Sequence, residues 1–237
     1  MRLDKYISDS APYSRKEIKK LIKYGAITVN GIIAAKPEMQ VTANDSVEID
    51  GETINYAKYV YLVLNKPQGY ISATEDKHYP VVTDLVPEEY SHYNVFPVGR
   101  LDIDTEGLLI LTNDGAFDHA VTSPKKNVYK RYFARLDKPV EPEDIDTFAA
   151  GMTFKEFTAK PAKLEICENP NEAYVEIAEG KFHQVKRMFE RVGKTVVYLK
   201  RVSIGGLALP EDLEPGEVME SDENELKMLI FGTQKFE

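Results

Sequence analysis

The sequence predicts an α+β protein with a small N-terminal domain over residues 1–55 and a larger domain over residues 56–237. Two observations support this prediction. The first 25 residues carry apolar side chains at helical spacing, whereas later segments contain short apolar runs bounded by turn residues, which is typical of strands. A chain of 237 residues is also long enough for one large domain accompanied by a small one.

Two short helices and two strands are expected in the N-terminal domain. The apolar face of the first helix is formed by Leu3, Tyr6 and Ile7. Ser14-Arg15-Lys16-Glu17 matches a capping box that begins a second helix, and Gly25 is placed to end that helix in a left-handed conformation. Strands are expected over residues 26–29 and 47–49, with a hairpin turn at Asn30-Gly31.

The second helix belongs to a basic segment of an otherwise acidic chain. The whole protein has a net charge of −9, but residues 1–37 contain eight basic and three acidic residues, a net +5. Because local charge decides where a polyanion binds, a basic N-terminal segment in an otherwise acidic chain is consistent with a contact with RNA. A solvated basic helix face is the alternative. The candidate RNA-contact residues here are Arg15, Lys16 and Lys20.

The larger domain is expected to begin after a linker at residues 53–58. Its first strand, at residues 59–64, is followed by the turn Asn65-Lys66-Pro67-Gln68-Gly69 and an irregular segment over residues 72–98. Further strands are expected at residues 108–111, 128–136, 152–166, 173–178 and 195–209. Helices are expected at residues 116–121, 142–151, 179–192 and 222–229.

Charged residues crowd the start of the strand at residues 108–111. The stretch Gly99-Arg100-Leu101-Asp102-Ile103-Asp104-Thr105-Glu106-Gly107 places three carboxylates and an arginine there. Burying a charge is costly unless it is paired, so this loop is the first candidate for chemistry. Two other interpretations exist. The aspartates could cap a turn, or they could begin a calcium loop, although the required bidentate glutamate is replaced by Asn113.

The same stretch resembles the sequence motif of the RsuA-type ribosomal RNA pseudouridine synthases. The resemblance rests on Gly99-Arg100-Leu101-Asp102 and on Asp104-Thr105-Glu106-Gly107-Leu108-Leu109, and it implies that Asp102 is the catalytic residue. Asn65-Lys66-Pro67-x-Gly69 is similar to the start of the family's catalytic domain. Lys66 is therefore either a phosphate contact or a solvated turn lysine, and we favour the contact. Residues 1–50 similarly resemble the S4 (αL-type) RNA-binding module.

Two further segments match the family. Lys130-x-Tyr132 implies that Tyr132 lies in the active site, with the neighbouring Tyr129 as the alternative register. Glu179-Gly180-x-x-x-Gln184-Val185-Lys186-Arg187-Met188-Phe189 implies that Lys186 pairs with the catalytic aspartate, although many pseudouridine synthases have arginine there. Arg100 and Arg187 are candidate RNA contacts. His183 could be a general base, but a loop histidine that bonds to backbone is favoured.

The resemblance implies a catalytic domain with a mixed, mostly antiparallel sheet flanked by helices, and a cleft joining residues 99–107, 132 and 186. It also implies site-specific isomerisation of uridine to pseudouridine in ribosomal RNA, without a cofactor or metal. The partner would be ribosomal RNA or a partly assembled small subunit. The small subunit is favoured because an S4-like module is present, the chain is compact and no basic tail is seen.

Composition limits the other possibilities. No stretch of about twenty apolar residues could span a membrane. The N-terminus is amphipathic and is not a signal peptide. The single cysteine, Cys167, cannot form an internal disulfide, and no Cys/His metal spacing occurs. We therefore expect a cytoplasmic monomer. Alternative functions are modification of large-subunit RNA, a non-catalytic RNA-binding assembly factor, and a metal-dependent nuclease using Asp102 and Asp104.

Overall fold

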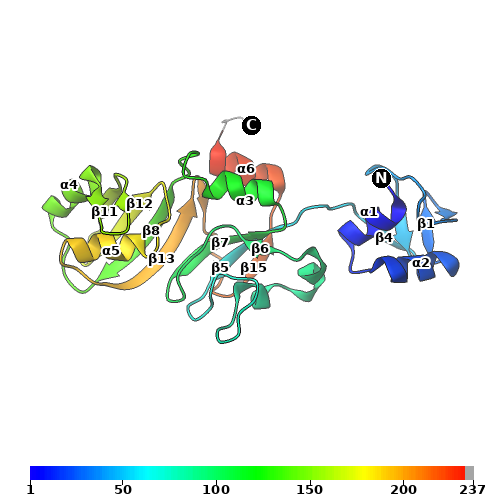
Figure 1. Ribbon diagram of the computed structural model, residues 1–237, viewed down its shortest axis with the longest axis horizontal. Coiled ribbons are helices and arrows are strands. Elements are labelled where there is room, and N and C mark those ends of the chain that lie inside the picture. The colour runs from blue at the N-terminus through cyan, green and yellow to red at the C-terminus, as the bar shows by residue number, and fades with distance from the viewer. Residues whose placement is uncertain (233–237) are drawn as a thin grey trace. The chain divides into compact units, whose positions relative to one another are not determined.

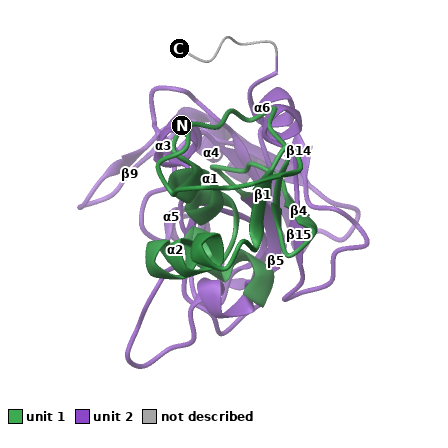
Figure 2. Ribbon diagram, turned by 90° about the vertical axis from the view of Figure 1, so that its right-hand side faces the viewer, with its two compact units in different colours: residues 1–60, 87–94 green, residues 61–86, 95–237 purple. Residues whose placement is uncertain are grey.

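The computed structural model describes residues 1–232, so the last five residues of the predicted second domain lie outside the described range. Residues 1–60 and 87–94 form one compact unit, and residues 61–86 together with the rest of the chain form a second (Figure 2). The boundary expected after residue 55 stays a prediction. No helix within residues 1–232 is long and apolar enough to cross a membrane.

The first unit contains two helices and a four-stranded antiparallel sheet. Its elements are α1 (Leu3–Ser10), α2 (Arg15–Lys23), β1 (Ile27–Val29), β2 (Ile32–Ile33), β3 (Val47–Ile49) and β4 (Glu52–Ile54), with the sheet order β2-β1-β3-β4. The short 3₁₀ helix η2 (Glu88–Tyr93) belongs to the same unit. A core of fully buried aliphatic side chains joins the helices to the sheet, including Leu3, Ile7, Ile18, Ile27 and Val47.

Local sequence explains the boundaries of these elements. The predicted capping box is confirmed, because the Ser14 side chain accepts a hydrogen bond from the Glu17 amide while the Glu17 carboxylate accepts one from the Ser14 amide. Asn30 and Gly31 both have positive φ, as the predicted hairpin turn requires. The predicted linker at residues 53–58 is wrong at its start, because Glu52–Ile54 pairs with β3 as strand β4.

The second unit is built around one nine-stranded sheet (Figure 1). Its main order is β11-β12-β8-β13-β7-β5-β15, with β14 paired to β13 and β6 paired to β7. The strands are β5 (Tyr61–Lys66), β6 (Phe96–Pro97), β7 (Glu106–Thr112), β8 (Lys130–Leu136), β11 (Lys163–Ile166), β12 (Glu172–Ile177), β13 (Val196–Ile204), β14 (Leu207–Ala208) and β15 (Val218–Glu220). Only β7 and β13 pair in parallel, which confirms the predicted mixed, mostly antiparallel sheet.

Helices flank both halves of this sheet (Figure 1). α4 (Pro142–Ala150) and α5 (Gln184–Arg191) lie beside the half that contains β8, β11 and β12, and their Phe148 and Phe189 rings are 5.0 Å apart. α3 (Gly115–Thr122) and α6 (Glu223–Phe231) lie beside each other at the other half. The remaining elements are the 3₁₀ helix η1 (Val82–Leu85) and the hairpin of β9 (Met152–Thr153) and β10 (Thr158–Ala159).

The start of α5 differs from the prediction. Residues 179–183 form a loop, and the helix begins only at Gln184, because His183 adopts a left-handed conformation with φ of 52° that cannot continue a helix. The sequence spacing predicts a buried face of Val185, Met188, Phe189 and Val192. The first three are buried, whereas Val192 follows the helix as its C-cap and is only partly buried. The delayed start matters because it frees Lys181–His183 to lie at the mouth of a pocket.

Candidate active site

A pocket of about 660 Å³ lies in the second unit, where β7, β8 and β13 meet. Its lining includes the loop 98–104, Lys130 and Tyr132 of β8, Arg201 of β13, and Glu179–His183 with Lys186 around the start of α5. The structure thus brings the predicted cleft residues Asp102, Tyr132 and Lys186 together from distant parts of the chain.

Gly107 explains how the aspartate-bearing loop reaches the centre of the sheet. Its φ is +101°, and a Cβ built there would lie 2.2 Å from the carbonyl oxygen of Arg201 on β13. Only glycine permits this approach of the two parallel strands. The loop before it closes in a turn, in which the Thr105 amide donates to the Asp102 carbonyl at 3.1 Å. The turn interpretation of the loop therefore describes its backbone, while both aspartate side chains line the pocket.

Lys66 holds the underside of this loop. Its side chain is fully buried, and its Nζ donates to the carbonyl oxygens of Pro67, Asp102 and Thr105 at 3.0, 3.1 and 2.9 Å. A lysine ammonium has three donors, so all of them are used within the protein. Burial lowers the pKa of Lys66 to about 8, against the opposing fields of Asp104 and Asp102. The predicted phosphate contact is therefore wrong, because this amine cannot reach RNA.

Lys186 bridges the two aspartates of the loop. Its Nζ lies 3.0 Å from Oδ2 of Asp102 and 2.5 Å from Oδ1 of Asp104. Partial burial works against the charge of Lys186, but the hydrogen bonds to Asp104 and Asp102 outweigh it and raise the pKa of Lys186. Partial burial likewise would raise the pKa of Asp104, yet the hydrogen bond from Lys186 keeps this pKa below its usual value. The Asp102 side chain is 28% exposed and so remains reachable from the pocket.

Tyr132 and Arg201 lie opposite each other on neighbouring strands, and Lys130 is on the same face as Tyr132 because it is two residues away on β8. Tyr132 lines the pocket and is 7% exposed, whereas Tyr129 is 53% exposed. Arg201 is buried, and its Nε donates to the Leu108 carbonyl at 2.7 Å. Lys130 is also buried, and burial together with the charge of Arg201 lowers the pKa of Lys130 to about 8.

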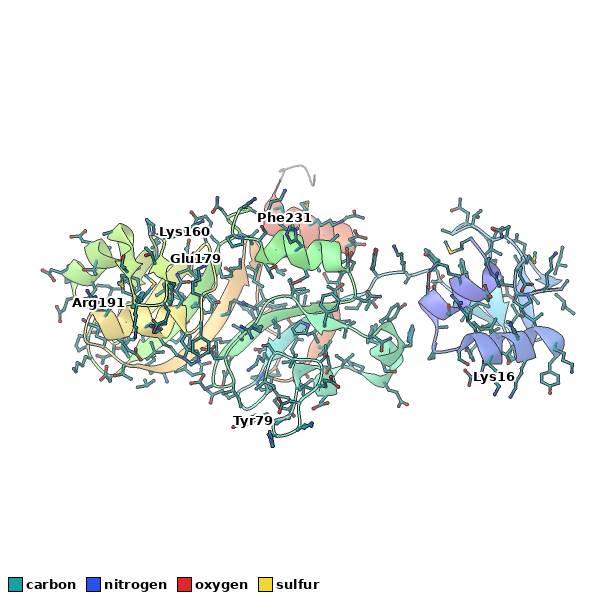
Figure 3. The ribbon with its side chains drawn as sticks, in the orientation of Figure 1. Lys16, Tyr79, Lys160, Glu179, Arg191 and Phe231 are labelled. Carbon is teal, nitrogen blue, oxygen red and sulfur yellow. The ribbon has the colours of Figure 1, made fainter. Side chains whose placement is uncertain are left out.

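The other predicted contacts lie in different surroundings. Arg100 is exposed at the edge of the pocket. Arg187 does not line the pocket. Its guanidinium pairs with Glu156 and lies over the rings of Phe154 and Phe157, while its side chain remains 25% exposed, so the RNA contact of Arg187 stays a prediction. The three predicted RNA-contact residues of α2 are exposed on the first unit, as Figure 3 shows for Lys16. They are Arg15, Lys16 and Lys20.

Sequence reasoning missed three of the pocket's cations, Lys130, Lys181 and Arg201. Lys130 could have been found, because the two-residue spacing to Tyr132 on a strand places both side chains on one face. Arg201 could not, since its place opposite Tyr132 is set by the pairing of β13 with β8, two strands far apart in the sequence. His183 lies closer to the aspartates than expected for a simple loop histidine, with Nε2 at 3.6 Å from Oδ1 of Asp102.

Comparison with known proteins identifies this arrangement. The family model described as RNA pseudouridylate synthase matches residues 60–191, which include Asp102, Tyr132 and Lys186. The chain belongs to this family. A second family model, described as S4 domain, matches residues 1–47. The predicted family and enzyme class, with an S4 domain at the N-terminus, are confirmed.

Relatives of this pseudouridine synthase match it over nearly the whole chain. It is 44% identical to an uncharacterized RNA pseudouridine synthase of Bacillus subtilis strain 168, over 97% of this chain and 98% of the relative. It is 38% identical to the ribosomal small subunit pseudouridine synthase A of Escherichia coli strain K12, over 97% and 100% of the two chains. A solved structure titled as a pseudouridylate synthase aligns with a TM-score of 0.68 and 35% identity, covering 97% of this chain and 100% of that one.

The geometry of this synthase suits a reaction on a single extruded base. A carboxylate that is charge-paired yet partly exposed faces a pocket of the size that encloses small ligands. Tyr132 offers an aromatic surface within that pocket. Buried cations at Lys130 and Arg201 place positive charge under the same space. The pocket therefore has room for a planar base next to the Asp102 carboxylate.

Proposed function

We propose that this protein isomerises a specific uridine to pseudouridine in small-subunit ribosomal RNA, with Asp102 as the catalytic residue. The observation that carries the proposal is the Asp102–Lys186 pair at 3.0 Å inside a pocket that also contains Tyr132. The substrate follows from the relatives named as ribosomal small subunit pseudouridine synthase A. The working partner is that RNA, free or in a partly assembled subunit, and the enzyme acts as a cytoplasmic monomer.

The reaction exchanges one bond for another. The bond from ribose C1′ to uracil N1 breaks, the base turns, and C1′ joins C5. The hydrogen of C5 leaves to solvent and N1 takes up a proton, so the atoms balance without a cofactor. The uridine must first leave the RNA stack, at a cost of a few kcal/mol. Asp102 then adds to the base, adds to C1′, or removes a sugar proton, while its carboxylate is paired with Lys186 at 3.0 Å.

The surrounding residues have supporting roles in this proposal. Tyr132 stacks on the extruded uracil and can exchange a proton through its hydroxyl. Arg100, exposed at the edge of the pocket, binds the backbone phosphate of the extruded nucleotide. In the S4 domain Arg15, Lys16 and Lys20 bind phosphates and contribute affinity without choosing the base.

Tritium release from small-subunit RNA labelled with [5-³H]uridine tests the function. Wild type should release tritium, and Asp102→Asn should lower the rate on the order of 10⁴-fold, as expected when a central catalytic group is lost. Asp104→Asn is the matched control, because its carboxylate is 63% exposed and belongs to the same loop. Losing that more exposed ion pair should cost only about fivefold.

The substrate and the active site are tested separately by the same assay. The RNA is used with and without bound ribosomal proteins, and large-subunit RNA serves as a second substrate. Binding without release from any RNA would favour an assembly factor. Release from large-subunit RNA alone would overturn the substrate, and undiminished release by Asp102→Asn would overturn the catalytic residue.

A further inference from the structure

Phe182 is a large apolar side chain left open at the mouth of the active-site pocket. It lines the pocket and yet is 69% exposed. One face of its ring lies against the imidazole of His183, with 3.8 Å between ring centroids and 18° between ring planes. The exposed fraction therefore belongs largely to the opposite face. Other large apolar side chains of the chain are exposed as well, but this ring lines the pocket, so its open face is available to a ligand there.

A network of hydrogen bonds fixes the segment that carries this ring. The Lys181 amide donates to Oε1 of Gln184 at 3.0 Å, and Nε2 of Gln184 donates to the buried Glu179 carboxylate at 3.2 Å. Glu179 also accepts from the Lys160 amide at 2.8 Å, and Figure 3 shows these two residues side by side. The ring is thus held in place before any ligand arrives, which reduces the entropy lost on binding.

His183 joins the ring to the catalytic aspartate. Its left-handed backbone, with φ of 52°, turns the chain so that the imidazole lies under Phe182. The same imidazole places Nε2 at 3.6 Å from Oδ1 of Asp102. A base stacked on Phe182 would therefore lie one ring layer away from a side chain that contacts Asp102.

The surroundings favour a nucleic-acid strand as the occupant. Cationic side chains predominate in the pocket lining, with five lysines and arginines against three carboxylates: Arg100, Lys130, Lys181, Lys186 and Arg201 against Asp102, Asp104 and Glu179. Lys181 and Arg100 are exposed near the ring, where they can meet phosphates. An aromatic face with cations beside it is the arrangement that binds single-stranded nucleic acid.

We propose that Phe182, supported by His183, is a stacking platform for the nucleobase next to the target uridine in the RNA strand. This subsite rests on the proposed function and differs from the role of Tyr132, which is 7% exposed and lies deeper, against the extruded base itself. Because every base has a π face, the platform accepts any neighbouring base. It keeps the unpaired strand open at the pocket and helps to hold the uridine outside its stack.

Binding of a short RNA tests the platform directly. The chain contains no tryptophan, so Phe182→Trp introduces a single fluorescent reporter. The probe is a single-stranded heptanucleotide with one central uridine among adenosines, together with two versions in which the 5′ or the 3′ neighbour of the uridine is abasic. The intact probe should quench the tryptophan, and one of the two abasic probes should bind without quenching it.

Affinity supplies the second readout. Phe182→Leu should weaken binding of the intact heptanucleotide by about five- to a hundredfold, the range expected for the loss of one stacked base. Phe182→Tyr should restore it, because a phenol ring also stacks. Tyr129→Leu is the matched control, since Tyr129 is 53% exposed and does not line the pocket. In the tritium assay Phe182→Leu should raise KM more than it lowers kcat.

The outcomes separate this proposal from the function on which it rests. Equal affinity of wild type and Phe182→Leu, quenching that neither abasic probe removes, or no binding of the heptanucleotide by wild type would overturn the platform. Tritium release that is identical in wild type and Phe182→Leu would remove the platform and leave the proposed function. Binding that depends on Phe182, without release by wild type, would do the reverse.

Discussion

The two units of the molecule use cationic residues in opposite ways. In the first unit, the basic side chains of α2 are all exposed to solvent: Arg15, Lys16, Lys19, Lys20 and Lys23. In the second unit, Lys66, Lys130 and Arg201 are at most 9% exposed and donate to backbone carbonyls. Exposed charges attract a polyanion and are screened by salt, whereas buried charges fix geometry and are screened much less.

This contrast separates affinity from catalysis. Removing the exposed cations of the S4 domain one at a time should have small, similar effects on RNA binding. The buried cations of the catalytic unit are each tied to particular atoms of the pocket, so their removal should change rate or stability instead. Lys186 stands between these extremes, because it is partly buried and its partners are carboxylates of the active site.

The largest effect should come from Lys186. Lys186→Met leaves Asp102 and Asp104 without their shared cation, and losing one partner of a desolvated ion pair costs about 2–5 kcal/mol. We expect kcat in the tritium assay to fall on the order of 10³-fold, with KM little changed. Lys186→Arg keeps the charge but changes the geometry, and it should recover part of the rate.

The pKa of Asp104 in Lys186→Met provides a second test of the bridge formed by Lys186. Hydrogen bonding to Lys186 holds the pKa of Asp104 below its usual value, so removing the lysine should raise that pKa. NMR titration of the Asp104 carboxyl group should therefore show a higher pKa in the variant than in wild type. A wild-type kcat, or a pKa of Asp104 that does not move, would contradict this role of the Lys186 bridge.

The next largest effect concerns stability. Lys66→Met leaves the carbonyl oxygens of Pro67, Asp102 and Thr105 without their buried donor. Unsatisfied buried groups cost about 1–3 kcal/mol each, partly recovered by relaxation, so we expect the free energy of unfolding to drop by about 3 kcal/mol in urea. Lys77→Met is the matched control, because Lys77 is exposed in the same unit and should change stability by less than about 0.5 kcal/mol.

The alkaline pH dependence of unfolding identifies the buried amine itself. Burial lowers the pKa of Lys66 to about 8, whereas the unfolded chain keeps this lysine protonated to about pH 10.4. Above pH 8 the unfolded state therefore binds more protons, so this group adds to stability as the pH rises, by about 1 kcal/mol per pH unit. The free energy of unfolding of Lys66→Met should lack that increase between pH 8 and 9.5. If wild type and variant show the same slope of unfolding free energy against pH, the burial of Lys66 is contradicted.

Much of the fold can be predicted from the sequence, because strand patterns, helix caps and turns depend on residues that are close together in the chain. The apolar run at Leu108–Leu111 has only one stable environment, a strand buried on both faces, and the structure places it at the centre of the sheet. The capping box at Ser14 and the turn at Asn30-Gly31 act within a few residues, so they also could be predicted. The pocket could be anticipated only through the family resemblance, since its parts come from strands far apart in the chain.

What could not be predicted depends on tertiary context. A lysine in a Pro- and Gly-rich turn is usually solvated, and nothing local indicates that Lys66 is enclosed by the loop it supports. Arg187 follows Lys186 directly, yet one turns toward Glu156 and the other toward Asp102. Helix geometry turns adjacent side chains about 100° apart, but the partner that each one meets is set by elements distant in sequence.

The smallest effects should come from the exposed cations of α2. Replacing Lys16, Lys19 and Lys20 by alanine removes three exposed cations from α2 and should weaken RNA binding modestly at low salt. Each lost phosphate contact lowers the slope of log K against log salt by about 0.7 to 1, so the triple variant should lose about 2 units of slope. At saturating RNA its kcat should match wild type, because these residues act on affinity. A fall in kcat at saturation would mean that the S4 domain positions the uridine, and the division between affinity and catalysis would fail.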